Sequence, residues 1–167
     1  GMAITGSNSN SLVVSQNTIS AFSGSAAAIL HGINVAGGID VRVLKNKIYD
    51  LSSGNSNADV SGIFQTTNTS FYATNNCIGD LRAPFAANDN AVKGISIGGG
   101  SSILVRNNSV LLSGSSSGAN FGSSAIYAST TATLTLQNNL LINRALANGS
   151  GKTVAFRRSN STFSSYS

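Results

Sequence analysis

The sequence contains no glutamate and no tryptophan, and it has one cysteine, one histidine and one proline. Charged residues make up 9% of the chain, far below the roughly one quarter usual for soluble domains. The single cysteine, Cys77, excludes a disulfide within the chain. No apolar run reaches the about 18 residues that a membrane-spanning helix needs, so we expect no membrane span.

The positive net charge reflects scarce acids rather than abundant bases. The net charge is +5, from ten lysines and arginines and five aspartates, and Arg157-Arg158 is the only adjacent basic pair. Nucleic-acid binding requires a clustered basic patch with aromatic residues nearby. The scattered charges therefore exclude nucleic acid as an expected partner, whereas a polyanionic glycan remains compatible with them.

Serine, asparagine and glycine are abundant, with 29, 20 and 18 residues respectively. Such a composition is found in disordered chains. Disorder, however, normally accompanies low hydrophobicity, and this chain has a mean hydropathy of +0.11 with regularly spaced Ile, Leu and Val residues. We therefore expect a folded chain.

The regular spacing is a repeat of the form apolar-x-x-Asn-x-apolar. The anchor asparagines of the five copies lie 29, 30, 32 and 31 residues apart: Asn17, Asn46, Asn76, Asn108 and Asn139. A second column has intervals of 30, 32, 31 and 30 residues, in motifs such as His31-Gly32-Ile33: Ile33, Ile63, Ile95, Ile126 and Phe156. Two columns with matching periods predict a solenoid in which each unit of about thirty residues forms one coil.

Within each unit, short segments alternate apolar and other residues, as in Val41-x-Val43 and Ile103-x-Val105. This is the pattern of β-strands, and no segment has a helical stripe. We predict an all-β, right-handed parallel β-helix of about five coils. We expect each anchor asparagine to turn the chain in the left-handed backbone region and to stack on the asparagine of the next coil, forming a ladder.

The Asn-x-[Ile/Val/Leu] repeat resembles the parallel β-helix repeat of the pectin-lyase-like superfamily, over roughly residues 12–163. The resemblance implies a secreted or cell-surface location and a polysaccharide or cell-surface glycan as partner. That superfamily includes lyases, glycosidases, phage tailspikes and adhesins, so the resemblance leaves the activity open.

Asp50 and Asp80 are the candidate catalytic residues, because they occupy equivalent positions in Ile48-Tyr49-Asp50-Leu51 and Ile78-Gly79-Asp80-Leu81. Stacked carboxylates are used by glycosidases and recruited by Ca²⁺ sites. The alternative is a solvated pair neutralised by Arg82. We predict no metal site and no cofactor, with Ca²⁺ at the aspartates as the exception.

His31-Gly32 is similar to the His-Gly pair of polygalacturonases, but the Asn-Thr-Asp, Asp-Asp and Arg-Ile-Lys motifs of that family are absent. A structural or surface role is therefore expected for His31. Cys77 should face outward, with no histidine in its column, so no thiol catalyst is expected.

Tyrosines and one arginine are the candidate binding residues. Tyr49, Tyr72 and Tyr127 would form a sugar-stacking face, with Arg82 as a polar contact, if all three tyrosines lay on one side. The alternative is that each is partly buried and amphipathic.

The poverty of ionisable groups favours a non-catalytic structural or adhesion module with weak glycan binding. The alternatives are a fragment of a polysaccharide lyase or glycoside hydrolase, and a phage tailspike-like fibre segment. We expect residues 1–167 to form a single β-helix domain that is a segment of a longer protein, because the repeat pattern runs to both ends. End coils without caps would permit end-to-end self-association, and we expect pairing or fraying around Val154–Phe163.

Overall fold

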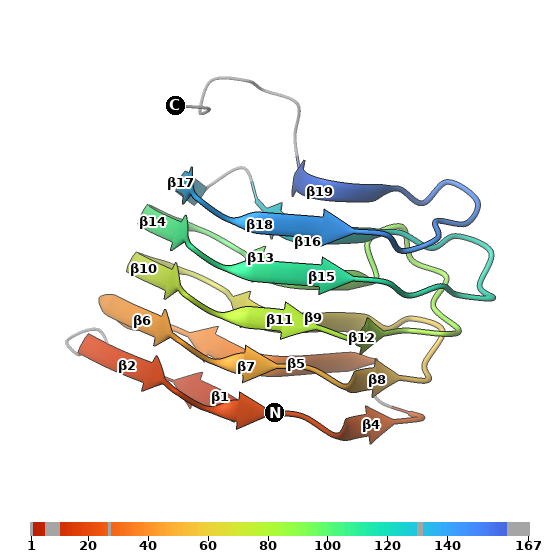
Figure 1. Cartoon of the computed structure of the whole chain (residues 1–167), viewed down its shortest axis with the longest axis horizontal. Coiled ribbons are helices and arrows are strands. Elements are labelled where there is room, and N and C mark those ends of the chain that lie inside the picture. Colours follow the sequence, from red (N-terminus) through yellow and green to blue (C-terminus); the bar gives the residue numbers. More distant parts are fainter. Residues whose placement is uncertain (1, 6–10, 27, 130–131, 160–167) are drawn as a thin grey trace.

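The computed structural model describes residues 2–5, 11–26, 28–129 and 132–159. This part of the chain forms nineteen β-strands and no helix. All the paired strands are parallel and belong to four sheets, which the chain visits in turn as it winds upward (Figure 1). The predicted all-β parallel solenoid of about five coils, roughly 30 residues apart, is confirmed.

Sheet A has six strands, in the spatial order β1 (Met2–Thr5), β5 (Ile29–Ala36), β9 (Asp59–Gln65), β13 (Val92–Ile97), β16 (Ser123–Ala128) and β19 (Thr153–Arg158). Sheet B has five, in the order β2 (Ser11–Ser15), β6 (Asp40–Leu44), β10 (Asn68–Thr74), β14 (Gly100–Arg106) and β17 (Ala132–Gln137). Sheet C has five, in the order β3 (Thr18–Ile19), β7 (Lys47–Ile48), β11 (Cys77–Gly79), β15 (Ser109–Leu112) and β18 (Leu140–Asn143). Sheet D has three, in the order β4 (Phe22–Gly24), β8 (Leu51–Ser53) and β12 (Leu81–Arg82).

The corner between sheets B and C contains the repeated asparagine. The backbone there enters the left-handed region, with φ between 50° and 59°, one residue before each anchor: at Gln16, Lys45, Asn75, Asn107 and Asn138. The expectation that the anchor itself makes the left-handed turn is therefore wrong. The preceding residue makes the turn, which leaves the anchor side chain free to face its neighbours along the solenoid axis.

The anchor asparagines form one continuous ladder along the solenoid. In each step, the backbone N–H and the Nδ2 of one asparagine donate to the Oδ1 of the next, at 2.9–3.0 Å. The Nδ2 of each asparagine from Asn46 onward also donates to a carbonyl of the preceding coil, as Asn76 does to Val43 at 2.8 Å. Asn46, Asn76 and Asn108 are buried, so the ladder satisfies polar groups that would otherwise be costly inside the molecule.

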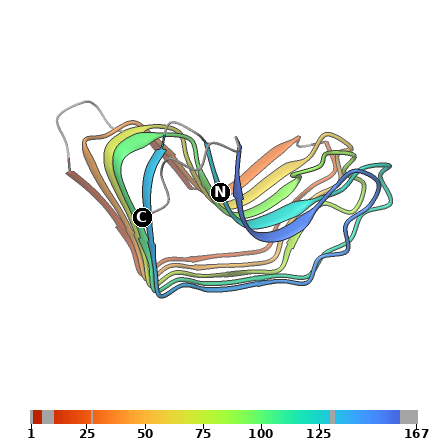
Figure 2. The ribbon, with the colours of Figure 1, turned by 90° about the horizontal axis from the view of Figure 1, so that it is seen from above.

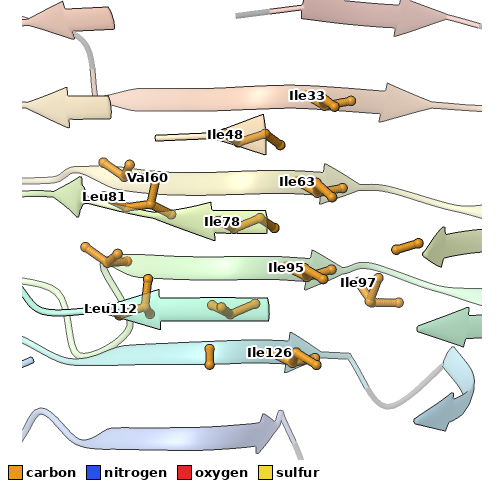
Figure 3. Close-up of a cluster of buried hydrophobic side chains, with 14 of the residues drawn as sticks. Ile33, Ile48, Val60, Ile63, Ile78, Leu81, Ile95, Ile97, Leu112 and Ile126 are labelled. Atoms are coloured by element: carbon orange, nitrogen blue, oxygen red, sulfur yellow. The ribbon is translucent and has the colours of Figure 1, made fainter. Parts of the chain in front are cut away.

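The apolar core lies inside the coils and receives side chains from all four sheets, among them Phe71 of sheet B and Leu51 of sheet D. Figure 3 shows Ile33, Ile63, Ile95 and Ile126 stacked on successive strands of sheet A, with Ile48 and Ile78 of sheet C beside them. All six are at most 1% exposed. The isoleucine column of sheet A therefore meets, in the core, the apolar residues that follow the anchor asparagines by two positions, so both columns keep the same period.

Glycine precedes the isoleucine in three coils because the sheets approach closely there. A Cβ at Gly94 would lie 2.4 Å from Val110 Cγ1 and 2.5 Å from the carbonyl oxygen of Ala125, and one at Gly62 would lie 2.5 Å from Ile78 Cγ2. The glycine and the isoleucine after it thus both face the core. The strand bends at these two positions, between the outward-facing residue before the glycine and the outward-facing residue after the isoleucine. Viewed along the solenoid, sheet A is dented inward, so its outer face is concave (Figure 2).

The segments that connect sheets C and D to the next strand of sheet A are rich in Gly, Ser and Asn, as in 83–91 and 113–122. They gather on one side of the solenoid, at the right of Figure 1. In the part of the chain that the structure describes, no helix has the length and apolar character needed to span a membrane.

Candidate functional site

The concave outer face of sheet A carries two facing rows of side chains. Row 1 precedes the bend and contains His31, Ser61, Lys93 and Ser124, which are aligned by strand register. Row 2 follows the bend and contains Asn34, Phe64, Ser96, Tyr127 and Arg157.

Aromatic contacts connect the two rows across the bend. The His31 ring stacks on Phe64 of the next coil, with centroids 4.1 Å apart and planes 12° apart. Lys93 Nζ lies 5.9 Å from the centroid of Tyr127, again one coil further on. In both contacts a residue of row 1 meets a residue of row 2 from the next coil, so the bend brings the two rows together.

Asp59 is the acidic residue that the polar and basic side chains of row 1 contact. It begins β9, and its Oδ1 accepts from Lys93 Nζ at 2.6 Å and from Ser61 Oγ at 3.3 Å, while His31 Nε2 lies 4.0 Å away. The side chains of Lys93 and His31 are 7% and 8% exposed, whereas Asp59 is 32% exposed. A lysine so deeply buried requires a paired carboxylate, which Asp59 supplies.

Burial lowers the pKa of His31 below the ordinary 6.5, and Lys93 lowers it further, while the Asp59 carboxylate opposes both. His31 is therefore neutral at pH 7. Among the described residues, its Nε2 and the Oδ1 of Asn34 are buried without a hydrogen-bond partner. Both residues line an open hollow of about 250 Å³ at the N-terminal end of sheet A, with Met2, Ala3, Ile29 and Leu30.

Arg157 joins the C-terminal end of the concave face to an earlier loop. Its two terminal nitrogens donate to the backbone oxygen and to Oδ2 of Asp89, at 2.7 and 2.8 Å. In the same loop, Asn90 Oδ1 accepts from Ser124 Oγ at 2.7 Å. These bonds hold the loop before β13 against the concave face across two coils.

The candidate catalytic pair lies elsewhere, at the corner between sheets C and D. Asp50 and Asp80 both have positive φ, 54° and 48°, so they serve as left-handed turn residues. Arg82 lies between them, with one nitrogen on Asp50 Oδ1 and another 3.1 Å from Asp80 Oδ1. The structure thus brings together the three charged residues, but as an exposed ion-paired group. A Ca²⁺ ion there would have to displace the guanidinium.

The three candidate tyrosines are not brought together. Tyr127 lies on sheet A, Tyr72 lies on sheet B with the Arg42 guanidinium 5.2 Å from its ring centroid, and Tyr49 follows β7 of sheet C with Lys47 Nζ 4.9 Å from its ring centroid. Tyr127 alone belongs to the concave face.

Asp59, Lys93 and Phe64 belong to the site but are not among the residues predicted from the sequence. For Lys93 the sequence does contain an indication, because Lys93 directly precedes a Gly-Ile pair, as His31 does. Cys77 is exposed on sheet C, away from this face. Within the described ranges, no three His, Cys, Asp or Glu side chains group closely enough to hold a metal ion.

Comparison with protein-family models, with curated proteins and with solved structures found no match for this chain. The fold and the two rows of sheet A are therefore the basis for assigning a function.

Proposed function

We propose that the chain is a non-catalytic β-solenoid scaffold of a secreted or cell-surface protein, related to the pectin-lyase-like superfamily, that binds a glycan weakly along sheet A. The observation that carries this proposal is row 2 of the concave face, because its members other than the buried Ser96 are half-buried and can be reached by a ligand: Asn34, Phe64, Tyr127 and Arg157. In row 1, Ser61, Lys93 and Ser124 are buried beneath it. The charges of Lys93 and Arg157 are compensated by aspartates. Such a surface suits the hydroxyls and C–H faces of sugars.

The same contacts favour binding over catalysis. Asp59 is engaged by Lys93, and both Asp50 and Asp80 are engaged by Arg82 on an exposed corner. An inverting or retaining pair of carboxylates must instead flank a scissile bond, with one of them protonated. The lyase or hydrolase alternative is tested by incubating the chain with the polysaccharides used below and measuring new reducing ends and unsaturated products.

The binding proposal is tested by affinity electrophoresis of the full chain in gels that contain individual neutral and acidic polysaccharides. We expect retardation by at least one of them and about a fivefold loss of affinity in Tyr127→Ala, because one stacking contact is worth about 1 kcal/mol. Tyr49→Ala and Tyr72→Ala are the matched controls on sheets C and B and should retain binding. Retention of binding by Tyr127→Ala together with its loss in either control would overturn the site, and no retardation by any polysaccharide would overturn the function.

A further inference from the structure

We infer that the glycan bound by sheet A is a neutral, linear β-1,4-linked polysaccharide that runs along the solenoid axis, with every second sugar ring stacked on an aromatic side chain. The inference rests on the proposed glycan binding and adds the class of the ligand and its direction on the concave face. Three observations carry it: the spacing of the aromatic residues in row 2, the contacts that hold their rings, and the balance of charge in the two rows.

Row 2 places its two aromatic residues two coils apart. Strand register aligns Phe64 with Ser96 and Ser96 with Tyr127, so the aromatic side chains are separated by two strand spacings, about 9.6 Å along the axis. Ser96 is buried between them, and its small side chain leaves room above it. Asn34 and Arg157 continue the row by one coil at either end, so each aromatic ring has a polar group beyond it.

This spacing fits a flat, extended sugar chain. In a β-1,4-linked chain of glucose, mannose or xylose, each ring is turned over relative to the one before, so every second ring presents the same face on the same side. One ring of such a chain advances by nearly the distance between two neighbouring coils. Two rings separated by one intermediate ring can therefore stack on Phe64 and Tyr127 at once, whereas an α-1,4-linked chain curves away after one contact.

The two aromatic rings are held by row 1 before a ligand binds. His31 stacks on Phe64 with the ring planes 12° apart, and Lys93 Nζ lies 5.9 Å from the centroid of Tyr127. Both contacts come from the preceding coil, so the two rings are supported in the same way. A side chain that is already ordered loses little conformational entropy on binding, which favours binding of a ligand that makes few contacts.

The charges of the two rows are satisfied within the protein, which favours a neutral ligand. Lys93 and Arg157 are the charged side chains of these rows, since His31 is neutral at pH 7, and each is paired with an aspartate, at 2.6 and 2.8 Å respectively. The aspartates, Asp59 and Asp89, are 32% and 52% exposed and would repel the carboxylate of an acidic sugar. Among the described residues of the two rows, no basic side chain is left to bind that carboxylate. Sugar hydroxyls, by contrast, can donate to the aspartates and accept from the bases.

Matched polysaccharides test the class of the ligand. The neutral probes are hydroxyethyl cellulose and arabinoxylan, their acidic counterparts are carboxymethyl cellulose and glucuronoxylan, and soluble amylose is the α-1,4-linked control. In affinity electrophoresis at physiological salt, we expect at least one neutral probe to bind about fivefold more tightly than its acidic counterpart and than amylose. The net charge of +5 attracts acidic polymers, so a preference for the neutral probe has to come from the site.

Oligosaccharides of increasing length test the spacing and the direction. A disaccharide of the preferred backbone can stack on one aromatic ring only, whereas a trisaccharide can reach both. In NMR titrations of the isotope-labelled chain, we expect about a fivefold gain in affinity from the disaccharide to the trisaccharide, the value of one added stacking contact. The gain should persist in Tyr127→Phe, disappear in Tyr127→Ala and be unchanged in Tyr72→Ala, the matched control on sheet B.

The outcomes separate this inference from the proposed function. Binding to amylose or to the acidic probes, with none to the neutral β-1,4-linked ones, would overturn the ligand class and leave glycan binding in place. Binding without a gain at the third ring, or with the same gain in Tyr127→Ala, would overturn the alignment along the axis. Absence of binding to every polysaccharide would overturn the proposed function itself, and this inference with it.

Discussion

His31 is the residue whose ionisation is most closely tied to the structure. Its side chain is nearly buried, it stacks on Phe64, and the charged groups facing it are Asp59 and Lys93. Because its pKa in the folded protein is lower than the ordinary 6.5, the folded state binds fewer protons than the unfolded state below that pH. The resulting stability is fully present above pH 6.5 and decreases as the pH falls through the folded pKa.

We therefore predict that the free energy of unfolding, measured by urea denaturation, decreases on acidification from pH 7 towards pH 5. In His31→Gln, which keeps a polar side chain of similar length, this part of the pH dependence should disappear. A wild-type protein with the same pH profile as His31→Gln would contradict the prediction.

At the scale of the element, the asparagine ladder joins all five coils. Asn76 accepts from the backbone N–H and Nδ2 of Asn46, and it donates to Val43 O and Asn108 Oδ1. Asn76→Ala would remove the acceptor of the Asn46 backbone N–H and Nδ2 and the side-chain donor to Val43 O, whereas Asn108 Oδ1 would still accept from the backbone N–H of residue 76. Each group left unpaired in this buried place costs about 1–3 kcal/mol. We predict a loss of at least about 3 kcal/mol in the free energy of unfolding.

Asn17→Ala is the internal comparison for that measurement. Asn17 is only half-buried at the end of the ladder, where water can replace its partners, so its loss should cost no more than about 1 kcal/mol. Equal losses at the two positions would mean that burial does not set the value of the ladder bonds.

The strands and their register follow from the sequence because each coil repeats its neighbour. The asparagine column that contains Asn46 and the isoleucine column that contains Ile63 both recur once per coil. Parallel stacking of the coils is the arrangement that keeps such columns aligned. The dent in sheet A could not be predicted in the same way, since it arises from the fit of Gly94 against Val110 of another sheet. The Asp59–Lys93 pair was missed because its partners are 34 residues apart and occupy different columns of the repeat, on adjacent strands before the bend.

At the scale of the whole molecule, the chain has no single centre of stability. Each coil contacts chiefly the coils before and after it, so the inner coils have two neighbours and the end coils have one. We predict that hydrogen exchange followed by mass spectrometry is slowest in β9, β10 and β13 and fastest in β1 and β17. Uniform protection from end to end would show instead that the solenoid opens as one cooperative unit.

The direction of the strand-to-strand hydrogen bonds also determines how the molecule bears load. In all four parallel sheets these bonds run along the solenoid axis, and so does the asparagine ladder. A force that pulls the two ends apart along this axis is parallel to these hydrogen bonds. It therefore separates the coils one after another and does not shear many layers of bonds at once. Each coil of about 30 residues that detaches would release about 100 Å of chain, so stretching would extend the protein in steps of nearly constant length.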